Sequence, residues 1–250
     1  ELFNRCAELG FLGLKFPEEY GGQGGSHLHD AIWVEELSRR GASGGVAAGL
    51  NAHSSIAMPP IFNFGDEWQR QRWLVPGIAG EKIGALGITE PGAGSDVASI
   101  RTSAKRVDGG FLVNGSKTFI TNGVRADFMV CAVKTTEEGG HGGISFLVLE
   151  SDMPGYEVTS KLEKLGWHAS DTGEIAPANL SGKPGRLALA HGHWPGDETV
   201  AAAVTDARRK AHPFTLVSAL LAQARFRSHT HDIAGAIEAA DEGLAIATEQ

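Results

Sequence analysis

A glycine-rich loop holds the residues of this sequence that are best suited to chemistry. The segment 88–96 (ITEPGAGSD) follows a short apolar run and contains two glycines, a threonine and a serine. The glycines would let backbone N–H groups approach an anion closely, and the hydroxyls of Thr89 and Ser95 would add donors. We interpret the loop as a cradle for a pyrophosphate or the edge of a heteroaromatic ring; the alternative is an ordinary glycine turn.

A second candidate lies at the end of a predicted strand. Phe119 and Thr121 are two residues apart, so a regular strand would place both side chains on one side. A flat cofactor could stack on the Phe119 ring and receive a hydrogen bond from Thr121. The alternative is that Phe119 is a core aromatic and that Asn122-Gly123 is only a turn signal.

The cysteines and histidines predict no metal or redox site. Cys6 and Cys131 have no CxxC partner and are expected to be core thiols, which favours a reducing, cytoplasmic compartment. Histidines two apart, at 191 and 193 and again at 229 and 231, would point to different faces of a helix. Because no cysteine or carboxylate completes either set, we interpret them as surface histidines.

Composition excludes two classes of partner. The 250 residues include 22 basic and 30 acidic ones, for a net charge of -8. No window holds the dense Lys/Arg run of a non-specific nucleic-acid binder, so no nucleic-acid partner is expected. No apolar run approaches the roughly 20 residues that span a bilayer, so we also expect no membrane span.

The first 80 residues are predicted to be mainly helical. Residues 1–10 read as the end of a helix with Gly10 at a left-handed stop, which suggests a fragment of a longer reading frame. Leu28, Ile32 and residues 34–37 are expected on the apolar side of the next helix. Capping residues and helix breakers bound the further helices: Ser26 to Gly41, about 44 to 57, and Asp66 to a break at Pro76-Gly77.

From Ile83 onward the pattern predicts β-structure. Residues 100–107 and 111–114, joined at Asp108-Gly109-Gly110, are typical of a hairpin. Other β-rich runs separated by turns are 118–120, 128–133, 144–149 and 156–159. Because no helix is expected between them, we predict an antiparallel barrel or sandwich and an α+β fold class.

Beyond residues 177–185 the composition shifts to an Ala-rich sequence with no strand signal. Asp197, Ala201 and Asp206 recur 35 residues later, close to the tetratricopeptide period of about 34. The tail 186–250 resembles the helical repeats that follow ATPase modules in bacterial regulators, so a helical-hairpin tail is expected. The predicted domains are a helical one at 1–80, a β domain at 81–176, and a linker with a tetratricopeptide-like tail at 177–250.

Residues 1–176 resemble the acyl-CoA dehydrogenase family. The motifs stand in the family's order: NAH at 51–53, FGDE at 64–67, GITEPGAGSD at 87–96, NGSKTFITNG at 114–123 and KLGWHASDT at 164–172. The resemblance implies a helical N-terminal domain and a β middle domain that holds one face of FAD. It implies these cofactor-binding residues: Leu86, Gly87, Ile88, Thr89, Gly94, Ser95, Phe119, Ile120 and Thr121. Ser95 would also touch the acyl-CoA, and Thr121 would reach toward flavin N5.

The resemblance also implies an activity. It is the FAD-dependent α,β-dehydrogenation of an acyl-CoA thioester to trans-2-enoyl-CoA, in fatty-acid β-oxidation. It further implies an electron-transferring flavoprotein as acceptor and a homo-oligomer built largely through the C-terminal domain. In the family the base that removes the α-proton is a glutamate of that domain, which we expect to be missing here, so no catalytic residue is nominated.

Two further expectations accompany this function. Glu157, Glu163 and Glu174 are interpreted as solvated charges rather than bases. The alternative function is a helical-repeat interaction protein or a chimeric reading frame without activity.

Overall fold

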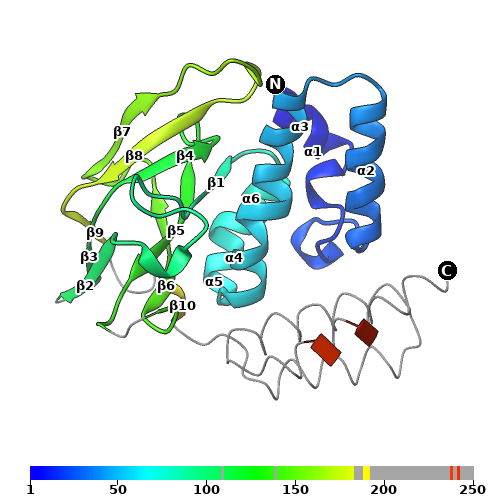
Figure 1. Cartoon of the computed structure of the whole chain (residues 1–250). Helices are drawn as coiled ribbons and strands as arrows, with labels where there is room; N and C mark the ends of the chain where they lie inside the picture. Colours follow the sequence, from blue (N-terminus) through cyan, green and yellow to red (C-terminus); the bar gives the residue numbers. More distant parts are fainter. Residues whose placement is uncertain (108–109, 138–139, 183–187, 192–236, 239–240, 243–250) are drawn as a thin grey trace. The chain divides into compact units, whose positions relative to one another are not determined.

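The computed structural model describes residues 1–107, 110–137, 140–182, 188–191, 237–238 and 241–242. The chain divides into two compact units, Glu1–Gly192 and His193–Gln250. The first unit holds nearly all of the described residues, and its helical segment lies beside its strands (Figure 1).

The helical segment fills the first third of the chain. Its α-helices are α1 Leu2–Glu8, α2 His27–Arg39, α3 Gly44–Asn51, α4 Met58–Phe64, α5 Glu67–Gln69 and α6 Val75–Ile78. π-Helical turns at Ala52–Ala57 and Arg70–Leu74 connect α3 to α4 and α5 to α6. Short 3₁₀ turns lie at Phe11–Gly13, Glu18–Tyr20 and Val97–Ser99.

The predicted helix starts and the first stop are confirmed. Gly10 adopts the left-handed conformation with φ of 79° after α1. Ser26 caps α2, and its hydroxyl accepts from the backbone N–H of Leu28. Asp66 caps α5 in a capping box with Gln69, in which each side chain bonds the other residue's backbone N–H at 2.8 Å. These signals depend on neighbouring residues alone, which explains why the sequence reveals them.

Two predicted helix ends are wrong. The helix expected to stop near 57 continues through Pro59 and Pro60 as α4, and the one expected to break at Pro76 continues to Ile78. In both cases a π-helical turn comes just before the prolines, and the N–H of Met58 bonds back five residues to His53. The wider turn leaves a carbonyl without its usual partner at the point where proline has no N–H to donate.

The buried side of α2 also differs from the prediction. Leu28 and Ile32 are 56% and 51% exposed. Leu37 faces the neighbouring cluster as predicted, together with Trp33, whose ring stacks on Phe11 with centroids 4.0 Å apart. A helix turns about 100° per residue, so this second pair lies on a different stripe of α2.

The described strands form two sheets. They are β1 Gly84–Gly87, β2 Ser103–Val107, β3 Gly110–Asn114, β4 Lys117–Thr121, β5 Phe128–Lys134, β6 Ile144–Glu150, β7 Tyr156–Lys161, β8 Thr172–Pro177, β9 Leu180–Gly182 and β10 Ala188–His191. In the larger sheet the order is β10-β6-β5-β2-β3-β9, with β1 beside β5, and in the smaller it is β4-β8-β7. The predicted hairpin is confirmed by the pairing of Val107 with Gly110, and every other predicted run lies in a strand.

The sheet arrangement corrects two predictions. The larger sheet is mixed rather than antiparallel, because β1 pairs with β5 in parallel and β2 meets β5 in parallel at Ser103 and Lys134. Parallel pairing arises because the chain enters β1 from α6 rather than from a hairpin. The described strands form two sheets that share a core, which fits the sandwich alternative, and among these strands there is no closed barrel.

The expected linker and tail also require correction. β9 lies in the predicted linker, and β10, where we expected no strand, pairs antiparallel with β6. Pairing of β10 with the edge of the sheet at β6 overrides the helix propensity of its Ala- and Leu-rich sequence. Apart from helical positions 237–238 and 241–242, the predicted repeats lie outside the described residues. So do the histidines at 193, 229 and 231, whereas His191 lies in a strand and not on a helix.

β5 is buried on both faces, which explains its unbroken apolar sequence. Phe128 and Val130 pack with Met58, Trp73 and other residues of the helical segment. Met129, Cys131 and Val133 point into a core that both sheets share. Cys6 and Cys131 are both buried, which confirms the prediction of core thiols, and burial raises the pKa of Cys131 to about 11.

Candidate functional site

A buried histidine fixes the start of β1, the strand that leads into the glycine loop. His53 is fully buried, its Nδ1 accepts from the backbone N–H of Gly84 at 2.9 Å, and its Nε2 lies 3.0 Å from the Gly77 carbonyl. Since Nδ1 accepts, Nε2 carries the proton and donates to Gly77. Burial lowers the pKa of His53 to about 4, so the ring is neutral at pH 7. This neutral ring connects the helical segment to the sheet.

The loop after β1 leaves donor groups free. Glu90 and Ala93 exchange two backbone hydrogen bonds of 2.7 and 3.1 Å around the tip of the loop. A Cβ added to Gly94 would stand in open space, with its nearest neighbour, a Thr89 methyl, 3.8 Å away. Within the described part of the chain, the N–H groups of Gly94 and Ser95 donate no hydrogen bond. Packing does not require this glycine, and a ligand could therefore approach free N–H groups closely.

β4 presents an aromatic ring to solvent through an irregular backbone. Phe119 has a φ of 59° and is 67% exposed, and the register with β8 shifts between Lys117 and Ile120. In a regular strand Lys117 and Phe119 would share one face. The bulge instead leaves Lys117 fully buried and Phe119 outside. A bulky residue with positive φ is strained, and such strain is concentrated at functional sites.

The structure joins the two predicted cofactor segments. The backbone N–H of Thr118 donates to the Thr89 carbonyl at 2.9 Å, which sets β4 beside the end of β1. Of the nine predicted residues, the buried ones are Gly87 and Ile120, the half-buried ones are Leu86, Ile88, Thr89 and Thr121, and the exposed ones are Gly94, Ser95 and Phe119. Gly94 and Ser95 lie farther along the same loop, beyond Glu90. We call these nine residues the signature face.

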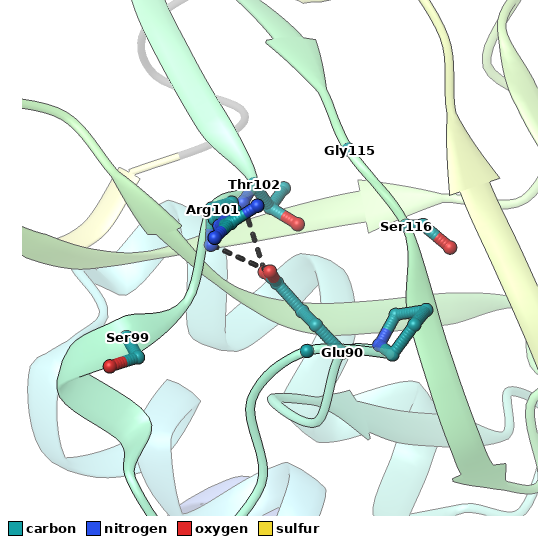
Figure 2. Close-up of a pocket in the computed structure, with 8 residues that line it drawn as sticks. Glu90, Ser99, Arg101, Thr102, Gly115 and Ser116 are labelled. Atoms are coloured by element: carbon teal, nitrogen blue, oxygen red, sulfur yellow. Dashed lines mark hydrogen bonds between the residues drawn. The ribbon is translucent and has the colours of Figure 1, made fainter.

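A pocket of about 330 Å³ lies next to this face but is not formed by it. Its lining residues are Glu90, Pro91, Gly92, Ser99, Arg101, Thr102, Gly115 and Ser116, and none of the nine predicted residues is among them. Figure 2 shows the Glu90 side chain extending from the loop toward residues 101 and 102. Its carboxylate accepts from the backbone N–H groups of Arg101 and Thr102 at 2.6 and 2.9 Å.

Sequence reasoning missed Glu90 and Lys117, which lie within the two segments that it identified. The Lys117 ammonium, fully buried, donates to the Glu90 carboxylate at 2.8 Å and to the Ile88 carbonyl at 3.0 Å. Burial would raise the pKa of Glu90, but its bonds from Lys117 and residues 101 and 102 hold the pKa below its usual value. The available signal was a lysine directly before a predicted strand, because a lysine that is buried in a sheet requires a buried anion.

The solvated-charge prediction is wrong for one of three glutamates. Glu157 and Glu163 are exposed, whereas Glu174 is half-buried in β8 and accepts a hydrogen bond of 3.0 Å from the Thr118 hydroxyl. Nothing in these contacts places Glu174 on the signature face.

The described residues contain neither a candidate metal site nor a candidate membrane-spanning helix. Among them, no group of three or more His, Cys, Asp or Glu side chains could hold a metal ion. No described helix is both long enough and apolar enough to cross a bilayer.

Family models match most of the first unit. The model of the acyl-CoA dehydrogenase N-terminal domain matches residues 1–81, and that of the acyl-CoA dehydrogenase middle domain matches residues 85–179.

Individual relatives agree with these matches. A mitochondrial isovaleryl-CoA dehydrogenase of Arabidopsis thaliana is 40% identical over 178 residues, which cover 71% of this chain and 43% of that protein. The short-chain-specific acyl-CoA dehydrogenase of Megasphaera elsdenii is 41% identical over 197 residues, 74% of this chain and 51% of the relative. The chain therefore spans about half the length of these curated relatives.

Solved structures share the fold. Butyryl-CoA dehydrogenase of Megasphaera elsdenii matches with a TM-score of 0.72 and 31% identity, over 99% of this chain and 67% of that one. An acyl-CoA dehydrogenase of Bacillus anthracis, solved in complex with FAD, matches with a TM-score of 0.69 and 31% identity, over 89% of this chain and 37% of that one. The matched fold, a helical segment followed by two sheets, is that of a class of oxidoreductase. The chain belongs to the acyl-CoA dehydrogenase family.

Proposed function

We propose that this chain supplies the N-terminal and middle-domain part of an acyl-CoA dehydrogenase and that its signature face binds FAD. The observation that carries the proposal is the meeting of the two segments: free N–H groups at Gly94 and Ser95, and an exposed aromatic ring at Phe119, are set by strands that share a hydrogen bond. Bound FAD would supply the hydride acceptor for dehydrogenation.

Each part of the face has a separate binding role. The N–H groups of Gly94 and Ser95, with the Ser95 hydroxyl, would hold the pyrophosphate. The Phe119 ring would cover one side of the isoalloxazine, and Thr89 and Thr121 would donate hydrogen bonds to its polar edge. Leu86, Gly87, Ile88 and Ile120 would shape the floor of the site, where a Cβ on Gly87 would meet the Met129 sulfur at 2.5 Å.

The proposed reaction converts an acyl-CoA thioester to trans-2-enoyl-CoA. Ser95 would also contact the acyl-CoA, and an electron-transferring flavoprotein would accept the electrons. In the family the base is a glutamate of the C-terminal domain, and neither matched domain model covers that domain. FAD retention, rather than turnover, is therefore the property that tests the signature face.

The test is to purify the chain with added FAD, remove free flavin by gel filtration and record the visible spectrum of the protein fraction. Retained flavin with a perturbed spectrum supports the proposal. A chain that is folded by circular dichroism yet never retains flavin contradicts it.

A matched pair of variants locates the binding. Phe119→Ala removes a 67% exposed ring from the signature face, and Phe64→Ala removes a 52% exposed ring from α4. Loss of one stacked ring is worth about 0.5–1.5 kcal/mol, so the Phe119 variant should bind FAD roughly two- to tenfold more weakly. Phe64→Ala should leave the affinity unchanged.

A further inference from the structure

Glu90 and Lys117 lie at the junction of three chain segments. The Glu90 carboxylate receives the Lys117 ammonium and the backbone N–H groups of Arg101 and Thr102 (Figure 2). Lys117 also donates to the Ile88 carbonyl. We call this set of contacts the Glu90 clamp. It joins the glycine loop to β4 and to the residues that lead into β2.

The clamp lies between the two halves of the signature face. Ile88 and Thr89 immediately precede Glu90 in the chain, and Phe119 follows Lys117 by two residues. Residues 88, 89 and 90 are each bonded to residue 117 or 118, at 3.0, 2.9 and 2.8 Å. A buried charged contact and a backbone hydrogen bond therefore hold the loop beside the strand that carries the Phe119 ring.

The bulge in β4 is what allows this arrangement. It turns Lys117 inward to the carboxylate while Phe119, two residues on, stays 67% exposed. A buried ammonium requires its partner, so Glu90 holds Lys117 in place and thereby stabilises the irregular backbone that presents the ring.

We propose that Glu90 and Lys117 are positioning residues of the flavin site: their buried contact fixes Thr89 against Thr118 and holds the Phe119 ring at the working distance from the loop. This inference rests on the proposed function. Neither residue touches the cofactor in this account.

The chain contains a matched control at Glu150, on the last residue of β6. Its side chain is 7% exposed, as is that of Glu90, and it also contacts buried and cationic donors: Trp73, Arg72 and Lys82. These contacts tie residues 72, 73 and 82 of the helical segment and its exit to the larger sheet, and none of them involves a residue of the signature face. Glu90→Gln and Glu150→Gln therefore remove the same group at equal depth and differ in what the group positions.

The experiment measures two quantities on both variants. The first is hydrogen exchange at the Thr118 amide, which bonds Thr89 and not Glu90, relative to the Val130 amide of β5 as a reporter of global opening. The second is the FAD dissociation constant by flavin fluorescence. In Glu90→Gln we expect faster relative exchange at Thr118. We also expect FAD to bind roughly tenfold more weakly, by analogy with metal sites, where loss of a residue that orients a ligand lowers the affinity by about 10- to 100-fold. In Glu150→Gln both should match the wild type.

A second variant covers the case in which Glu90→Gln does not fold. Glu90→Gln with Lys117→Met leaves no unpaired buried charge, and it should show the same loosening at Thr118 and the same loss of FAD affinity. Wild-type exchange at Thr118 in the folded Glu90 variants, or equal changes in the Glu90 and Glu150 variants, would overturn the proposal. If the wild type binds no FAD, the proposed function fails, and the exchange data still decide whether the clamp positions the loop.

Discussion

Glu90 and Glu150 are buried to the same depth, but the cations that neutralise them are not. Lys117, the partner of Glu90, is fully buried, whereas Arg72 and Lys82, the partners of Glu150, are 35% and 31% exposed. Burial would raise the pKa of both carboxyl groups, and their hydrogen bonds hold both below the usual value. The Glu90–Lys117 pair is closed to solvent, whereas the Glu150 contacts are partly open to solvent at the junction of the helical segment and the larger sheet.

The two buried glutamates hold different kinds of element together. The Glu150 contacts join the helical segment to β6, and a shared apolar core also holds these two parts together. The Glu90 contacts join a glycine loop to a bulged strand, and the loop packs through Ile88 and Ala93 on only a small apolar cluster with Ile100 and Ala132. A partly exposed cation can turn to water when its partner is lost, but a buried one cannot.

The largest expected effect is on the closed pair. Lys117→Met leaves the Glu90 carboxylate buried without its cation, which should lower the free energy of unfolding by about 3–5 kcal/mol. Arg72→Met should cost no more than about 1 kcal/mol, because Lys82 still neutralises Glu150 and the Trp73 indole N–H still donates to it. Urea unfolding monitored by tryptophan fluorescence compares the two. Equal losses in both variants would show that the two pairs do not differ as described.

The next effect concerns the seam between the helical segment and the sheet. His53 has a pKa of about 4 in the folded chain against an ordinary 6.5, because burial outweighs the Gly77 hydrogen bond and the nearby Asp127 charge. Between these values the unfolded chain binds the proton and the folded chain does not. Stability should therefore fall by roughly 3 kcal/mol as pH drops from 6.5 to 4. The contributions of Glu90 and Glu150 to stability are lost at lower pH, as the pH falls through their depressed pKa values.

The control for this pH window is His53→Gln, whose amide can accept from Gly84 and donate to Gly77. Denaturant unfolding at several pH values should show the slope between 6.5 and 4 in the wild type and its loss in the variant. A slope that persists in the variant would assign the pH dependence to other groups and would remove His53 from the account of the seam.

Local signals made part of the fold predictable from the sequence. The caps at Ser26 and Asp66, the stop at Gly10 and the 103–114 hairpin depend on residues a few positions apart, and they are confirmed. Helix ends at the prolines were wrong because π-helical turns accommodate them. β10 was missed because only pairing with β6 makes Ala188–His191 a strand.

The candidate site divides in the same way. The two motif segments could be identified because their glycines, hydroxyls and aromatic ring lie close together in the sequence. That Thr118 bonds Thr89, or that Lys117 bonds Glu90 27 positions away, depends on the sheet register and on the β4 bulge. Neither was visible to reasoning from periodicity, which instead treated β4 as a regular strand.

The central claim is that FAD binds at the signature face, and amide chemical-shift mapping with ¹⁵N-labelled protein tests it most directly. On addition of FAD we predict shifts at Gly94, Ser95 and Thr121, with the Trp73 indole N–H that bonds Glu150 unchanged. Shifts confined to the helical segment around Trp73, or no shifts with FAD in large excess over a folded chain, would contradict the account.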